Sequence, residues 1–299
     1  MSAEVETKTD DAPPAKETKG SIVWREIKGL LWVLLAVLLF HSFVAKPFYI
    51  PSESMMPRLL VGDRLVVAKY PYGWSYVSPT IPNPAAIFRS LILRRGPEPW
   101  GITLPFMKGR IFGKLPERGD IVVVTPPGKN EDYIKRVIGL PGDTIALRGG
   151  RVILNGVPLK SEVRPDLMLT VDANAPCSYE KFFDRLVETA DGSRCSLPIV
   201  RETLPNGVTY DTIDEGKGAS QGDDYGPVKI PADHVFLMGD NRDHSADSRY
   251  ALNQQGLGGP VPWENIGGRA EFITFSLDGT GPFGIRPGRA GSSLRGSKN

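Results

Sequence analysis

The fold is decided by residues 132–143, which read DYIKRVIGLPGD. An apolar, strand-like run fills most of this stretch, and side chains along a strand alternate between its two faces. Tyr133, Lys135 and Val137 therefore share one face. A lysine between an aromatic and a branched aliphatic side chain is a candidate for burial, and burial lowers the pKa of a lysine towards the neutral form. The alternative is a strand lysine whose charged head reaches water, and the strand taken alone favours this alternative.

Further strand and turn signals surround this stretch and predict a mainly antiparallel β protein. Residues 121–124 are a β-branched run between a Gly-Asp turn and two prolines, and Gly149-Gly150 predicts a hairpin. Glycine (33) and proline (27) make up about a fifth of the 299 residues, so turns should be many and helices few. Only residues 179–189 look helical within the body. Other strand or turn signals fall at residues 155–156, 206–207, 235–238 and 272–275.

The composition argues against several functions. A net charge of +2 favours neither a nucleic-acid partner nor an acidic substrate. Three histidines, two cysteines and no HExxH pattern argue against a catalytic zinc site. We therefore expect no metal, no cofactor and no nucleic-acid partner.

One apolar segment near the N-terminus predicts a membrane anchor. Residues 29–45 carry no charge and lie between Lys28 and Lys46. As a helix these residues would span about 25 Å, at the short end of what crosses a bilayer core of about 30 Å. A buried core helix would show a polar face, and a cleaved secretory signal would want a small residue where Phe43 stands. We therefore expect a disordered tail over residues 1–20 and a retained transmembrane anchor over residues 21–47.

The remaining chain divides into a body and two irregular stretches. Residues 48–278 are expected to form the body, with a possible cap region at 160–225. Residues 74–110, rich in Pro, Trp and Arg, are interpreted as an insertion, in which 85–93 could form a short helix. Residues 279–299 are expected to be a disordered basic tail. Cys177 and Cys195 could form a disulfide in an oxidising compartment, or remain two isolated thiols.

Residues 51–57, which read PSESMMP, contain a candidate nucleophile soon after the apolar segment. A serine hydroxyl is a poor nucleophile until a neighbouring base takes its proton, and a desolvated, neutral lysine can be that base. Ser54 and Lys135 are the candidates for this pair. An ordinary serine-rich turn is the alternative for the motif taken alone.

A third stretch, residues 239–249, reads GDNRDHSADSR and is dense in charge. A solvated turn and an acidic metal-binding loop are both conceivable, but interspersed arginines make a cation site poor. The favoured interpretation is a salt-bridged scaffold that fixes Ser245 near other polar groups.

Four motifs occur in order after the apolar segment: PSxSMxP, RGDIV at residues 118–122, YIKRxIGLPGD and GDNRDxSxDSR. In this order and spacing the chain resembles the bacterial type I signal peptidases, also called leader peptidases, over residues 30–280. The resemblance implies an antiparallel β-sheet catalytic body with one N-terminal transmembrane helix. It also implies a membrane-anchored serine endopeptidase that removes signal peptides from exported preproteins after small residues at −1 and −3.

The resemblance assigns roles to individual residues. Ser54 would be the nucleophile, Lys135 the general base, and Ser245 would orient the Lys135 amine. The Ser52 hydroxyl and the Ser54 backbone N–H would form the oxyanion hole. The loop would be held by Asp247 with Arg249 and by Asp240 with Arg242, and the substrate pockets would be lined by Phe48, Ile50, Leu59, Tyr133 and Ile134.

The resemblance also implies a location and partners. A signal-peptide cleavage site emerges at the outer surface of the bacterial cytoplasmic (inner) membrane. The N-terminus would therefore lie in the cytoplasm and the body on the periplasmic side, where a Cys177–Cys195 bridge is favoured. Signal peptides and the lipid bilayer would be the partners of a monomeric enzyme. The chain departs from the family pattern at Glu53, often Gly in relatives, at His244, commonly Asn, and in the long insertion.

Three other functions remain open. A Ser-His-Asp protease could use His244, although adjacency in sequence is not triad geometry. An inactive membrane-anchored β scaffold could bind precursors without cutting them. A self-cleaving Ser/Lys repressor would need a DNA-binding region, and none is evident.

Overall fold

The computed structural model describes residues 19–79, 81–82, 101–102, 109–174, 177, 185–190, 192–281 and 284–298. Residues 1–18 of the tail predicted over residues 1–20 and most of the 74–110 insertion, including the possible helix at 85–93, lie outside the described residues, whereas residues 19–20 belong to a helix. The chain divides into two compact units, Met1–Leu39 and Phe40–Asn299.

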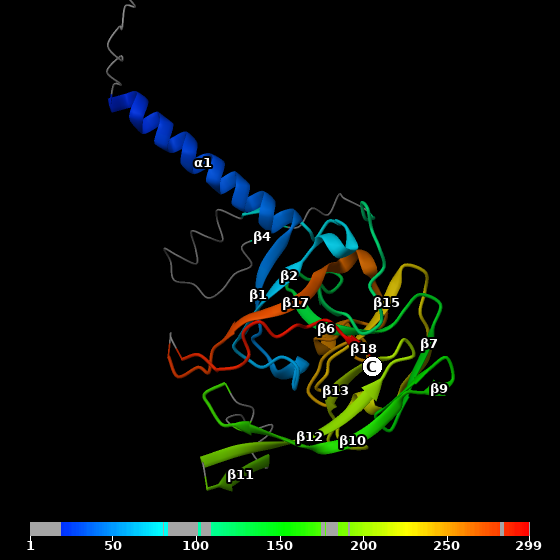
Figure 1. Cartoon of the computed structure of the whole chain (residues 1–299). Helices are drawn as coiled ribbons and strands as arrows, with labels where there is room; N and C mark the ends of the chain where they lie inside the picture. Colours follow the sequence, from blue (N-terminus) through cyan, green and yellow to red (C-terminus); the bar gives the residue numbers. More distant parts are fainter. Residues whose placement is uncertain are drawn as a thin grey trace, which may run out of the picture. The chain divides into compact units, whose positions relative to one another are not determined.

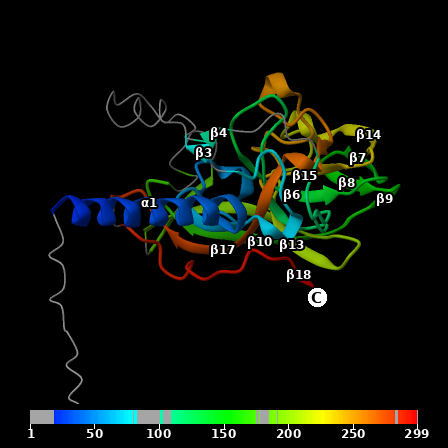
Figure 2. The ribbon, with the colours of Figure 1, turned by 90° about the horizontal axis from the view of Figure 1, so that it is seen from above.

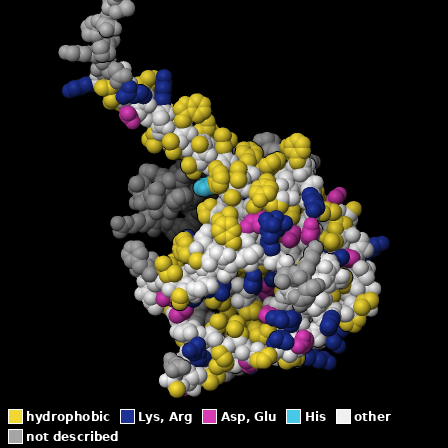
Figure 3. Space-filling model, viewed as in Figure 1, with side chains coloured by type: hydrophobic (Ala, Val, Ile, Leu, Met, Phe, Trp, Pro, Cys, Tyr) yellow, Lys and Arg dark blue, Asp and Glu magenta, His cyan; other side chains and the backbone are white. Residues whose placement is uncertain are grey.

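A helix, α1 (Lys19–Phe43), occupies the position of the predicted apolar segment. Most of its hydrophobic side chains are exposed, with Trp32 70% and Leu30 64% exposed (Figure 3). Within the part of the chain that is described, no helix is both long and apolar enough to cross a membrane. The structure therefore does not support the transmembrane span predicted for residues 21–47. Charged residues at Arg25, Glu26 and Lys28 fall inside α1 and shorten its uncharged run.

The body is built on a seven-stranded antiparallel sheet in the order β1-β2-β17-β5-β6-β15-β16 (Figure 1). This architecture confirms the predicted mainly antiparallel β fold. Its strands are β1 (Ala45–Tyr49), β2 (Asp63–Ala68), β5 (Ile121–Val124), β6 (Tyr133–Gly139), β15 (His234–Met238), β16 (Val261–Pro262) and β17 (Ile266–Ser276).

Three smaller sheets accompany the large one. One has the order β10-β12-β13-β18 with β11 added to β12, another the order β14-β7-β8-β9, and β3 pairs with β4. Their strands are β3 (Ile81–Pro82), β4 (Gly101–Ile102), β7 (Thr144–Arg148), β8 (Arg151–Leu154), β9 (Val157–Pro158), β10 (Lys160–Thr170), β11 (Leu186–Thr189), β12 (Gly192–Thr203), β13 (Val208–Ile213), β14 (Tyr225–Lys229) and β18 (Ser297–Lys298). Short 3₁₀ helices are η1 (Glu53–Met55), η2 (Tyr70–Tyr72), η5 (Gln221–Asp223), η6 (Leu252–Gln254) and η7 (Trp263–Asn265).

Strand β5 shows why the sheet has a core on both faces. All four of its residues are buried, as expected for a continuous β-branched run covered on each side. Ile121 and Val123 pack in one hydrophobic cluster, and Val122 and Val124 pack in another. Because its side chains alternate between the two faces of the sheet, this one strand contributes to both hydrophobic cores.

The predicted helix at residues 179–189 is wrong where the structure describes it. Leu186–Thr189 form strand β11, which pairs antiparallel with β12. The backbone hydrogen bonds available along β12 outweigh the local helical preference, as tertiary context commonly does.

The C-terminal segment also differs from its prediction as a disordered tail. Over residues 284–298 it runs back along β17 (red in Figure 2), where Phe272 and Ser293 form an antiparallel bridge. Leu294 is buried in a core cluster, and Arg289 pairs with the fully buried Asp63. Composition alone predicts disorder because it does not reveal that the arginines of this segment meet buried carboxylates.

Cys177 and Cys195 form a disulfide with a Cα–Cα distance of 5.6 Å, which confirms the favoured prediction. Both side chains are buried in one hydrophobic cluster with Leu197 and Met56. The bridge closes a loop with a sequence separation of 18, for which chain entropy gives about 3 kcal/mol of stabilisation.

We expect reduction of this disulfide to lower the melting temperature by several degrees, because the unfolded chain regains the entropy of the open loop. Thermal unfolding with and without reductant measures the effect. A Cys177→Ala/Cys195→Ala variant should melt low and show no response to reductant. Equal melting of oxidised and reduced wild-type protein would contradict the prediction.

Candidate active site

The two residues predicted to act together lie side by side. Ser54 stands in η1 and Lys135 in β6, and Lys135 Nζ donates a hydrogen bond of 2.9 Å to Ser54 Oγ. Ser54 is 8% exposed and Lys135 is 4% exposed. When the amine is neutral, the same contact allows the hydroxyl to donate its proton towards Nζ.

The surroundings of Lys135 favour the neutral amine. Burial lowers its pKa to about 8, although the carboxylates of Asp247 and Asp240 act in the opposite direction. The amine also donates to the backbone oxygen of Ile134 at 3.0 Å and lies 5.6 Å from the centre of the Tyr133 ring. Lys135 is buried, as its proposed pairing with Ser54 requires, and the hydrated lysine that the strand pattern alone favoured is wrong.

The segment that carries Ser54 is held by Asn241. Its backbone N–H donates to the Ser54 backbone oxygen at 3.2 Å, and its Nδ2 donates to the Glu53 backbone oxygen at 3.3 Å. Sequence reasoning did not single out this residue. A usable signal was present, because Asn241 is the one amide side chain in a loop of charged and hydroxyl groups.

Gly239 sits where the loop passes closest to the nucleophile. A Cβ at this position would lie 2.1 Å from Ser245 Oγ and 2.4 Å from the Ser54 backbone oxygen. Neither atom can remain in place with a side chain between them, so only glycine fits.

We expect Gly239→Ala to displace Ser54 or Ser245 and to lower kcat by about 100-fold, since a misplacement of about 1 Å can cost that much. Steady-state kinetics of a peptide substrate measures the loss. Gly281→Ala is the matched control, because Gly281 does not have a positive φ and a Cβ added there would meet nothing within 4 Å. Its kcat should persist. Wild-type kcat in the Gly239→Ala variant would contradict this close-approach argument.

Ser245 lies near the site but not in its predicted role. Its side chain is 3% exposed, and its Oγ has no hydrogen-bond partner among the described residues. Its Oγ forms no hydrogen bond with the Lys135 amine, whose described hydrogen bonds go to Ser54 Oγ and the Ile134 carbonyl. Ser245 still lines the same cleft as both residues.

Two ion pairs were predicted to hold the loop, and the structure contains one of them. Asp247 and Arg249 are paired at 2.9 Å, and both are buried. Asp240 is paired with Arg136 of β6 at 2.6 Å rather than with Arg242, which is a correction. Arg242 is instead paired at 2.6 Å with Glu202 of β12, because a bidentate carboxylate on that strand faces its guanidinium group.

A cleft of about 800 Å³ surrounds the Ser54–Lys135 pair. Of the residues predicted to line a substrate pocket, Phe48, Tyr133 and Ile134 do so. Ile50 and Leu59 do not, because both are fully buried in the core beneath the cleft. Further lining residues include Ser52, Glu53, Asp243, His244 and Ala246.

His244 lies in this cleft, with its Nε2 3.4 Å from Glu215 Oε1. The base in contact with the Ser54 hydroxyl is Lys135, so the geometry gives no support to a triad built on His244. Within the described residues, no group of three or more His, Cys, Asp or Glu could hold a metal ion.

A serine hydroxyl bonded to a buried amine is the arrangement of hydrolases that use lysine as a base. Comparison with known proteins agrees with this class. Residues 23–275 match the family described as "Signal peptidase, peptidase S26". The chain therefore belongs to the signal peptidase family, peptidase S26, and is an enzyme of the serine peptidase class.

Curated relatives support the same family assignment. A protein named Signal peptidase I from Rickettsia massiliae is 34% identical over 277 residues, which cover 90% of this chain and 83% of the relative. Its namesake from Rickettsia typhi is 34% identical over 261 residues, covering 85% and 81%. A solved signal peptidase I from Enterococcus faecalis shares 23% identity, and the match covers 52% of this chain and 97% of that chain with a TM-score of 0.26.

Proposed function

We propose that this chain removes signal peptides from exported preproteins, cutting after small residues at −1 and −3, with Ser54 as nucleophile and Lys135 as general base. The observation that carries the proposal is the 2.9 Å contact between Ser54 Oγ and a lysine amine that is 4% exposed. The family of the chain supports the substrate class.

The chemistry would proceed through an acyl-enzyme. Ser54 Oγ attacks the carbonyl carbon of the scissile peptide while its proton passes to Lys135 Nζ. The tetrahedral intermediate then expels the amine of the mature protein, which takes the proton from the lysine. A water molecule, deprotonated by Lys135 Nζ, then attacks the ester carbonyl. As the bond to Ser54 Oγ breaks, Lys135 returns this proton to Oγ and the signal peptide leaves as a carboxylic acid. Lys135 thus serves both half-reactions without a net change in its charge.

Stabilisation of the developing oxyanion is assigned to the Ser52 hydroxyl and the Ser54 backbone N–H. Ser52 lines the cleft beside Ser54, and Ser54 lies in the first turn of η1, where backbone N–H groups have no partner within the helix. Such donors commonly contribute several kcal/mol to lowering the barrier. Phe48, Tyr133 and Ile134 supply apolar walls against which small side chains at −1 and −3 would pack.

The location proposed for the body is the outer side of the bacterial cytoplasmic membrane. The Cys177–Cys195 disulfide supports it, because such bonds persist in oxidising compartments. The exposed apolar surface of α1 supports contact with lipid.

Protease added to spheroplasts should digest the body, and α1 should keep the protein in the membrane fraction. Protection of the body in intact spheroplasts would place it on the other side.

The decisive experiment incubates the detergent-solubilised protein with a precursor that has Ala at −1 and −3, followed by sequencing of the new N-terminus. Cleavage directly after the −1 residue is expected, and it should disappear when Ala at −1 is replaced by a bulky residue. Ser54→Ala should abolish cleavage, whereas His244→Ala should largely spare it. Binding of the precursor without cleavage by wild-type protein would favour the inactive scaffold instead.

A further inference from the structure

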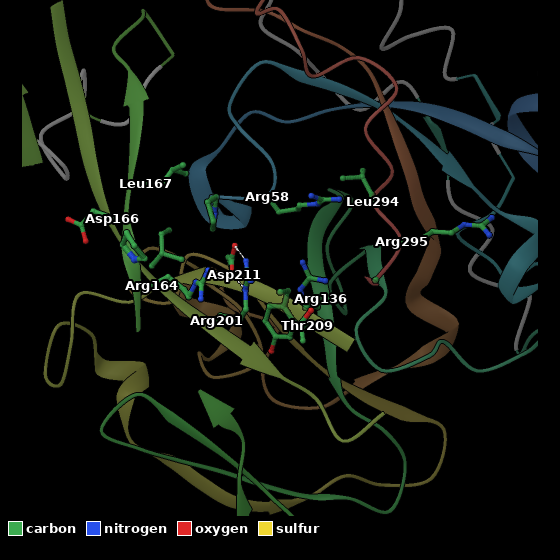
Figure 4. Close-up of a pocket in the computed structure, with 15 residues that line it drawn as sticks. Arg58, Arg136, Arg164, Asp166, Leu167, Arg201, Thr209, Asp211, Leu294 and Arg295 are labelled. Carbon is green, nitrogen blue, oxygen red and sulfur yellow. Dashed lines mark hydrogen bonds and ion pairs between the residues drawn. The ribbon is translucent and has the colours of Figure 1, made fainter. Parts of the chain in front are cut away.

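A second cavity, of about 590 Å³, shares no lining residue with the cleft at Ser54 (Figure 4). Its walls come from the loop after η1, from strands β6, β10, β12 and β13, and from the C-terminal segment. The volume lies within the range of small-molecule sites. Five arginines line it: Arg58, Arg136, Arg164, Arg201 and Arg295.

Four of these arginines each have a carboxylate partner, and Arg295 shares its partner with Arg269. Their carboxylate partners are Asp240 for Arg136, Glu162 for Arg164, Asp211 for Arg201 and Glu271 for Arg295. Arg58 differs, because its Nη2 donates to the backbone oxygen of Ser293. Among the described residues, no carboxylate forms an ion pair with Arg58. The cavity therefore holds one cation whose charge no ion pair balances.

Arg58 and Arg136 lie at different depths of the cavity. Arg58 is exposed and reaches across the cavity towards Leu294, whereas Arg136 is 3% exposed (Figure 4). The pKa of Arg58 lies below its usual value because surrounding protein removes part of its hydration and because Arg136 repels it. An anion placed between the two guanidinium groups would relieve this repulsion.

The shape of the cavity suits a tetrahedral anion. Arginines from five different segments line the cavity, and all but Arg295, whose side chain points away from the others, can offer donors from several directions (Figure 4). A phosphate can accept from several directions at once, whereas a carboxylate offers two oxygens in one plane. The Tyr210 ring lies 4.3 Å from the Arg136 guanidinium and fixes its position. A β-bulge on β10 between Arg164 and Leu167 turns this strand at the cavity wall.

The geometry points to a binding site for one phosphate ester, held between Arg58 and Arg136 with Arg164 and Arg201 at its sides. A single unbalanced cation matches the single negative charge of a phosphodiester. This ligand chemistry could come from a soluble phosphodiester or from a phospholipid headgroup. The site does not depend on the peptidase activity proposed for Ser54.

The first test measures binding of glycerophosphoglycerol, a soluble phosphodiester, to the full chain in neutral detergent by calorimetry. Saturable binding is expected, and Arg58→Gln should weaken it at least tenfold. Arg58→Lys should recover part of the affinity, since the charge is kept. Arg194→Gln is the matched control, because Arg194 donates to Thr170 Oγ1 on a neighbouring strand and does not line the cavity.

The second test distinguishes the two sources by flotation with vesicles of phosphatidylcholine alone or mixed with phosphatidylglycerol. Wild type is compared with Arg58→Gln, so that any lipid contact through α1 is common to both. If wild type binds the mixed vesicles better than Arg58→Gln does, the ligand is a lipid headgroup. If the two proteins differ only in their binding of the soluble diester, the ligand is a soluble phosphodiester. If Arg58→Gln, with a wild-type melting temperature, binds both probes as wild type does, or if wild type binds neither, the proposed site is wrong.

Discussion

Replacing Lys135 by methionine is expected to abolish peptide cleavage and, at the same time, to stabilise the fold. The amine contacts Ser54 Oγ at 2.9 Å, so its loss removes the base that would accept the hydroxyl proton. General-base catalysis commonly contributes between about 10²-fold and 10⁴-fold, and loss of a base that activates a nucleophile falls at the upper end. Rates of precursor cleavage by wild type and Lys135→Met measure this loss.

The pH dependence of the wild-type enzyme follows from the same side chain. Burial brings the pKa of Lys135 to about 8, so kcat/KM should rise as the pH increases through about 8 and the amine becomes neutral. A flat profile between pH 7 and 9 would contradict the assignment of Lys135 as the base. Lys69→Met is the matched control, because Lys69 is also buried with a pKa lowered to about 8, yet it does not line the cleft.

The stability effect has a definite sign. The pKa of Lys135 falls from 10.5 in its unperturbed form to about 8 in the fold, so the unfolded chain binds more protons between these values. Stability from this group therefore rises as the pH increases from about 8 to 10.5, and the full penalty applies below 8. Lys135→Met removes that penalty, a gain on the order of 3 kcal/mol at pH 7. Melting temperatures of the two proteins should converge above pH 10, and equal stability at pH 7 would show that the buried charge costs nothing.

Strand alternation made Lys135 a candidate for burial, but taken alone it favoured a lysine whose head reaches water, and it did not reveal the contact with Ser54. The prediction rests on a period of two residues, which holds whenever a strand has a covered face. Ser54 is 81 positions away, and no pattern of spacing reveals that η1 packs against β6. The motif order and family resemblance supplied this pairing. Ile50 and Leu59 show the limit of that transfer, because both lie in the core rather than in the cleft.

Electrostatic partners were predicted less well than the hydrophobic pattern. Asp240 and Arg242 are two positions apart, and the family resemblance implied that they pair. In the structure Asp240 pairs with Arg136, 104 positions away, because β6 and β15 are neighbours in the sheet. The C-terminal segment was predicted to be disordered for the same reason. Its ordered structure depends on contacts such as the one between Arg289 and Asp63, which are 226 positions apart. Partners of this kind are set by tertiary topology and leave no local sequence signal.

Breaking the Arg136–Asp240 pair is expected to produce a large loss of stability in the body. The two side chains are 3% and 1% exposed and share two hydrogen bonds of 2.7 and 2.6 Å. Asp240→Ala would leave a buried guanidinium without its counter-charge, which costs about 3–5 kcal/mol. Chemical unfolding of the single variants Arg136→Met and Asp240→Ala measures each loss.

A double-mutant cycle tests whether the pairing is the one that the structure contains. Arg136→Met combined with Asp240→Ala should be much less damaging than the sum of the single changes, because no buried charge is left unpaired. A cycle between Arg242 and Asp240 should give a smaller coupling, since Arg242 makes its bidentate bonds to Glu202. Arg201 and Asp211 supply the exposed reference: they also form two hydrogen bonds, but their side chains are 39% and 34% exposed, so solvent should reduce their coupling to below about 1 kcal/mol. A stronger coupling for Arg242–Asp240 than for Arg136–Asp240 would restore the pairing suggested by sequence adjacency. It would also mean that β6 is not anchored to the 239–249 loop in the way that brings Lys135 to Ser54.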